Sequence, residues 1–178
     1  MRLNTHRLVF LSLHIALGTS LHLVEMLLPL PLPLPGVKLG LANIVTLLAL
    51  YLYGFRDGVT VALLRVFLGS LLGGTFLSPA FLLGICGAVV STAAMALLLR
   101  HTKCFSTIGI SMVGAVSHNI GQILAASLLL QSRAVLYYLP VLLLTGIPTG
   151  VFTGYILKSL MEHIEKSGAL KGFTQQEN

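Results

Sequence analysis

Six long apolar runs occupy most of the chain, and short polar segments separate them. A helix needs about 20 apolar residues to cross the hydrocarbon core of a bilayer, whereas barrel strands would alternate over about ten residues. The pattern therefore predicts an all-α integral membrane protein, a bundle of six transmembrane helices. We expect the spans at Leu8–Leu28, Leu39–Tyr53, Gly58–Leu72, Leu77–Leu99, Ile108–Leu130 and Leu136–Leu157.

The composition excludes a soluble protein. Charged residues make up 9% of the chain, against roughly a quarter in a soluble domain, so the chain could not cover a water-facing surface. We expect one transmembrane domain over residues 1–158 and a polar cytoplasmic tail over residues 159–178. The first part of the tail, KSLMEHIEK, is predicted to extend the last helix.

Basic residues predict the orientation in the membrane. With six spans, Lys38 and Arg133 fall on one side, and eight basic residues fall on the other. The positive-inside rule then places both termini in the cytoplasm of a multi-pass plasma-membrane protein. No basic cluster with interleaved aromatic residues indicates nucleic-acid binding. The eight residues are Arg2, Arg7, Arg56, Arg100, Lys103, Lys158, Lys166 and Lys171.

A Pro-Leu alternation follows the first span. It runs from Pro29 to Pro35 and closes at Gly36. Each proline lacks an amide donor and restricts the residue before it, so this segment is predicted to be extended rather than helical. It serves either as a stiff outer connector or as a lid over an outward-facing pocket.

Polar side chains inside the spans gather in the outer half of the predicted bundle. A charge at the bilayer centre costs about 2.5–3.5 kcal/mol on the insertion scale, so each one needs a reason. Residues at intervals of three or four lie on one helical face, and lipid would penalise turning such faces outward. We expect a cavity open to the outside that favours an anionic ligand. Its predicted binding residues are Arg65, His118, Asn119, Gln122, Asn43, Lys38, Glu25 and His22.

A structural alternative remains open for the same residues. Glu25 and Arg65 would then neutralise each other, while His118, Asn119 and Gln122 would join helices through hydrogen bonds.

Small residues four apart mark surfaces where helices approach closely in lipid. Gly69 and Gly73, and the repeated Thr-Gly pairs between 145 and 154, are predicted to be packing stripes. Ser12, Ala16 and Ser20 lie about 160° around the first helix from its polar face. This second face either docks a partner helix or consists of ordinary small residues of a membrane helix.

No catalytic pattern is present. Asp57 is the single aspartate, so the clustered aspartates that hold magnesium in prenyl synthases are missing. Neither a G-x-S-x-G elbow nor a Walker motif occurs. Cys86 and Cys104 have no metal-ligand spacing, and we interpret both as packing residues. We therefore expect no enzyme activity and no cofactor or metal bound by this chain. An ATP-driven process would need a separate ATPase.

Three segments carry a family resemblance. They are PGVKLGLANIVTLLALYLYG from Pro35, GFRDGVTVALLRVFLGSLLGGTF from Gly54 and GAVSHNIGQILAAS from Gly114. They resemble the Gx transporter family, whose members are labelled heptaprenyl diphosphate synthase component I. The resemblance runs from about Leu8 to Leu157, and GLAN and HNIGQ are its most specific parts.

The resemblance implies a substrate-binding S component of an energy-coupling factor transporter. Such a protein is a six-helix bundle that captures a vitamin-like substrate from outside and works with a transmembrane coupling subunit and two cytoplasmic ATPases. S components dock through an A-x-x-x-A motif, which would correspond here to Ser12, Ala16 and Ser20, with serine replacing alanine. We interpret the synthase label as a misnomer. The alternative is a non-catalytic membrane scaffold associated with prenyl diphosphate metabolism.

Overall fold

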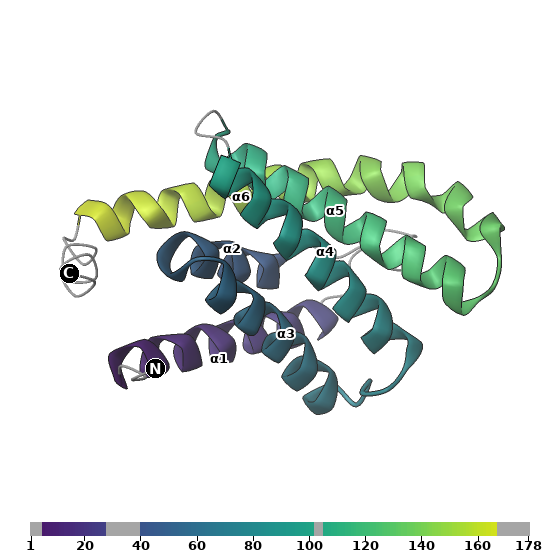
Figure 1. The fold of residues 1–178 in the computed structure, drawn as a ribbon, viewed down its shortest axis with the longest axis horizontal. Coiled ribbons are helices and arrows are strands. Elements are labelled where there is room, and N and C mark those ends of the chain that lie inside the picture. The colour runs from purple at the N-terminus through teal and green to yellow at the C-terminus, as the bar shows by residue number, and fades with distance from the viewer. Residues whose placement is uncertain (1–4, 28–39, 102–104, 167–178) are drawn as a thin grey trace.

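The computed structural model describes residues 5–27, 40–101 and 105–166. These residues form six α-helices and one short 3-10 helix (Figure 1). Each predicted span corresponds to one α-helix, with its ends shifted by a few residues apart from the longer C-terminal end of the sixth. The elements are α1 (Thr5–Leu27), α2 (Leu41–Tyr53), α3 (Phe55–Leu72), α4 (Pro79–His101), α5 (Thr107–Leu129), η1 (Arg133–Tyr138) and α6 (Leu139–Lys166).

Within the described residues, four helical segments are long and apolar enough to cross a membrane. They are Arg7–Leu27, Pro79–His101, Thr107–Leu129 and Arg133–Lys166. The other two helices, α2 and α3, do not meet this criterion, each for its own reason. Helix α2 is apolar but has 13 residues, and α3 has 18 residues but carries two charges in its first turn and another in its middle.

Helix α2 lies at the centre of the bundle and contacts each of the other five helices. Most of its side chains are buried, and Leu47, Leu48 and Leu50 pack with Met95, Ile110 and Leu157 in the largest apolar cluster. A short apolar helix in this position needs no polar face. A single residue, Gly54 with φ 80°, joins α2 to α3. Because glycine adopts positive φ without steric cost, the chain reverses here within one residue.

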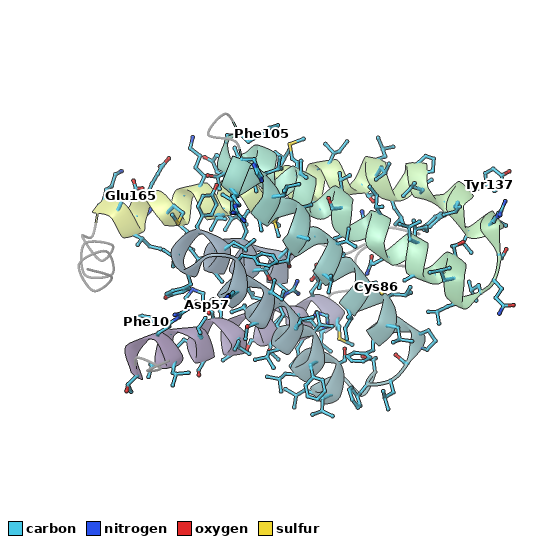
Figure 2. All side chains as sticks on the ribbon, viewed as in Figure 1. Phe10, Asp57, Cys86, Phe105, Tyr137 and Glu165 are labelled. Atoms are coloured by element: carbon cyan, nitrogen blue, oxygen red, sulfur yellow. The ribbon has the colours of Figure 1, made fainter. Side chains whose placement is uncertain are left out.

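The remaining helices cover α2 from two sides. Helices α1 and α3 pack on it and on each other, whereas α4, α5 and α6 pack in sequence (Figure 1). The start of α1 and the end of α6 lie at the same end of the bundle. Figure 2 shows Asp57 and Glu165 toward this end and Tyr137 at the opposite one.

The Thr-Gly stripe of α6 lies against α5. A Cβ added at Gly150 would lie 2.6 Å from Cα of Met112, and one added at Gly154 would lie 2.7 Å from Cα of Ile108. The two backbones therefore approach more closely than any side chain on α6 would allow, which is the packing predicted for small residues in lipid.

Parts of the sequence predictions fall outside the described residues. The Pro-Leu segment and Lys38 lie there, as does most of the predicted tail. Helix α6 continues past the predicted domain boundary at 158 and ends at Lys166, so KSLMEHIEK extends the last helix. One interpretation was wrong, because Cys86 is exposed on the surface of the bundle rather than packed.

Candidate functional site

All six α-helices contribute to a polar cavity within the bundle. Its volume is about 50 Å³, room for one or two water molecules, whereas sites for drug-sized ligands hold about 300–1,000 Å³. A metabolite of that size would therefore need the lining side chains or helices to move. The cavity brings together seven of the eight predicted binding residues: His22, Glu25, Asn43, Arg65, His118, Asn119 and Gln122.

Arg65 supplies the cation of the cavity. Its side chain leaves the middle of α3 and is 4% exposed. Nε donates a hydrogen bond of 2.9 Å to Oγ1 of Thr46, which is fully buried on α2. The stem passes Gly18 of α1, where an added Cβ would lie 3.3 Å from Cδ of Arg65. The missing side chain at Gly18 thus leaves the space in which the guanidinium reaches the cavity.

Glu25 joins the end of α1 to the start of α2. Its carboxylate is 7% exposed and accepts a hydrogen bond from the backbone N–H of Gly40, the residue that precedes α2. A negative charge at a helix N-terminus is stabilised by the helix dipole. The carboxylate also interacts electrostatically with Arg65. Glu25 therefore has a structural partner, the backbone of Gly40, besides Arg65, the cation with which the sequence could pair it.

Asn43 presents an unused acceptor. Its Nδ2 donates to Oγ of Ser91 on α4 at 3.3 Å, while its buried Oδ1 has no hydrogen-bond partner in the described part of the chain. A buried acceptor left unpaired costs about 1–3 kcal/mol. Oδ1 is thus suited to accept a hydrogen bond from a water molecule or from a donor group of a ligand.

Asn119 has a partner on another helix. Its Nδ2 donates to the carbonyl of Leu142 on α6 at 2.7 Å. For the amide nitrogen of Asn119, this bond agrees with the structural alternative, in which polar residues of α5 join helices. The side chain also lines the cavity.

Glycines on neighbouring helices make room for the other polar side chains. A Cβ added at Gly69 of α3 would lie 2.5 Å from Cδ2 of His22. One added at Gly87 of α4 would lie 2.8 Å from Cε1 of His118 and 2.9 Å from Cγ of Gln122. The sequence marked Gly69 as a packing position, but it gave no reason to select Gly87.

Sequence analysis missed three hydroxyl groups at the site. Thr149 and Thr153 of α6 line the cavity, and Oγ1 of Thr153 lies 2.9 Å from Oγ of Ser111. Thr46, one turn after Asn43, holds Arg65. The Thr-Gly repeat was the available signal for α6, and it was assigned to packing alone.

The predicted docking stripe lies away from the cavity. Ser12, Ala16 and Ser20 are all exposed on α1. The two serine hydroxyls donate to the carbonyls of Leu8 and Ala16 at 2.9 Å. Because these hydroxyls are satisfied within their own helix, the stripe presents a small and nearly apolar surface.

A family model described as heptaprenyl diphosphate synthase component I matches residues 14–160, which include all of the described cavity residues. No curated protein and no solved structure matches the chain.

Proposed function

We propose, from the premise that the chain belongs to the heptaprenyl diphosphate synthase component I family, that it is a substrate-binding membrane subunit. In this proposal all six helices cross the plasma membrane, both termini are cytoplasmic, and the cavity takes a small anionic metabolite from outside. The subunit resembles the S component of an energy-coupling factor transporter. ATP is used by two partner ATPases, which act through a transmembrane coupling subunit.

One observation carries this proposal. Polar residues that are distant in the sequence converge on one cavity, and Arg65 brings a charge into it. A charge inside a bundle of apolar helices is costly and is typical of a functional site. A carboxylate or phosphate of the ligand would bind the guanidinium through paired hydrogen bonds. Oδ1 of Asn43 would accept a hydrogen bond from a donor group beside that anion.

The exposed stripe on α1 supports the partner assignment. Small side chains with satisfied hydroxyls allow another helix to approach closely. We propose that the coupling subunit contacts the face formed by Ser12, Ala16 and Ser20.

The family description also names a synthase, which favours a second candidate. The chain would then be a non-catalytic scaffold for a prenyl-lipid enzyme. A catalytic role for this chain itself is disfavoured because Asp57, its single aspartate, pairs with Arg7 at 2.6 Å. The scaffold reading predicts co-purification of a synthase and no stoichiometric small metabolite.

Native mass spectrometry of the protein purified from its own host tests both candidates. We expect one small anionic metabolite per chain, strongly reduced in Arg65→Ala and partly retained in Arg65→Lys, which keeps the charge. Arg133→Ala is the matched control, since Arg133 is exposed on η1 and lies outside the cavity. Equal retention of the metabolite by a folded Arg65→Ala variant would overturn the site, and a bound synthase with an empty cavity would favour the scaffold.

A further inference from the structure

A second cavity lies at the opposite depth of the bundle, where α2 turns into α3. It has a volume of about 490 Å³ and lies between this turn and the last part of α4. Its walls include Leu50, Phe55, Ala93 and Leu97, and Arg100 is its charged side chain. The cavity shares no residue with the polar site, and the proposed function assigns it no role.

A smaller cavity of about 120 Å³ continues this second cavity along α3 and α4. The two cavities share Phe55 and Ala93, and the smaller one reaches Ala88. Together they form an apolar furrow, the α3–α4 furrow. From the exposed Val89 to Arg100 the furrow extends about 17 Å along α4 at 1.5 Å per residue. Half of the hydrocarbon core of a bilayer is about 15 Å thick, so the furrow matches the depth of one leaflet.

Small side chains on α4 create the furrow. Ala93 and Ala96 leave space opposite Phe55 and its neighbours on α3. Phe55 is 57% exposed and Leu97 is 60% exposed, so apolar groups of both walls remain uncovered in the described bundle.

The mouth of the furrow is basic. Arg100 lines it, and Arg56 lies next to Phe55 in the first turn of α3; both are exposed. The carboxylate nearest in sequence, Asp57, is already paired with Arg7. Among the described residues, neither of the two ion pairs includes Arg56 or Arg100. The mouth therefore favours an anionic group.

We propose that the α3–α4 furrow binds one acyl chain of an anionic phospholipid of the cytoplasmic leaflet, with its phosphate at Arg100. An apolar furrow one leaflet deep fits a single hydrocarbon chain, and a guanidinium binds a phosphate through paired hydrogen bonds. A partner helix is about 10 Å in diameter and over the length of the furrow would fill far more than the two cavities together. The anionic lipids of the cytoplasmic leaflet supply both parts of this ligand.

The test measures phospholipid retained by the full-length protein after transfer to detergent, again by native mass spectrometry. Phosphatidylglycerol and phosphatidylcholine are supplied at equal amounts in nanodiscs. We expect preferential retention of phosphatidylglycerol. Arg100→Gln should lower that preference about fivefold, the effect of one basic residue at an anionic surface. Ala93→Phe should abolish retention by filling the furrow.

Two matched controls separate the furrow from general effects. Arg133→Gln removes an exposed cation at the other end of the bundle, and Ala80→Phe adds the same bulk at an exposed position in the first turn of α4. Both should retain lipid as the unmodified protein does. Unchanged retention in Ala93→Phe, or equal retention of both lipids, overturns the proposal. Preference for a single-chain prenyl phosphate over phosphatidylglycerol, or release of a bound protein by Ala93→Phe, also overturns the assignment and names the other occupant.

Discussion

Individual side chains in the polar cavity depend on residues that lack a side chain. Arg65 passes Gly18, His22 lies against Gly69, and the polar groups of α5 lie against Gly87. In a bundle of apolar helices, a long polar side chain can turn inward only where the facing helix leaves space. The glycines therefore determine which polar residues reach the cavity.

Gly87→Ala tests this dependence at one residue. The added Cβ would lie within 3.0 Å of His118 and Gln122, so both side chains must shift. We expect a folded protein whose free energy of unfolding falls by about 1–3 kcal/mol, as in other overpacked sites. We also expect its affinity for the metabolite to fall at least tenfold.

Gly109→Ala is the matched control for this variant. Its Cβ would meet Phe105 at 3.4 Å, which is ordinary contact. Both substitutions replace a helical glycine by alanine, so their difference reports mainly the clash. Thermal unfolding and ligand retention measured side by side decide the outcome, and unchanged retention in Gly87→Ala would show that the cavity tolerates displaced side chains.

At the level of helices, the sequence predicted faces but not the contacts between them. His118 and Gln122, which intervals of three and four place on one face of α5, both line the polar cavity. The same intervals contain no information on which residue of another helix faces them. The bonds from Arg65 to Thr46 and from Asn119 to the Leu142 carbonyl depend on the rotation and depth of a second helix, so only the folded structure reveals them.

The contact between α5 and α6 gives the sharpest test of a helix pair, because its close approach involves backbone atoms of α5. In Gly150→Ala the new Cβ would lie 2.6 Å from Cα of Met112, a backbone atom that cannot rotate away. The two helices must therefore separate, and we expect a loss of stability of at least about 3 kcal/mol, the upper end for overpacking. Scanning calorimetry in detergent, with Gly109→Ala as reference, measures it. A loss below 1 kcal/mol would mean that α6 shifts along α5 at little cost.

For the whole molecule, the length and position of α2 bear on how α2 and α3 cross the membrane. Helix α2 is about 20 Å long at 1.5 Å per residue, shorter than the hydrocarbon core of about 30 Å. Its burial among five helices compensates for this short length, since a central helix need not meet lipid along its whole length. Six crossings place Arg56 in the cytoplasm together with His101, whereas an α2–α3 hairpin that does not reach the cytoplasmic side would keep Arg56, next to the hairpin turn, out of the cytoplasm.

Single-cysteine labelling in intact cells separates these topologies. In a background without Cys86 and Cys104, we expect an impermeant maleimide to label Gln131→Cys, at the outer end, and to leave Arg56→Cys and His101→Cys unlabelled until the membrane is permeabilised. Gln131 and His101 serve as the outside and inside references, since both are exposed next to helices long enough to cross. Labelling of Arg56→Cys in intact cells would contradict six crossings. It would also mean that the α3–α4 furrow does not lie in the cytoplasmic leaflet, because Arg56 and Phe55 begin the same helix.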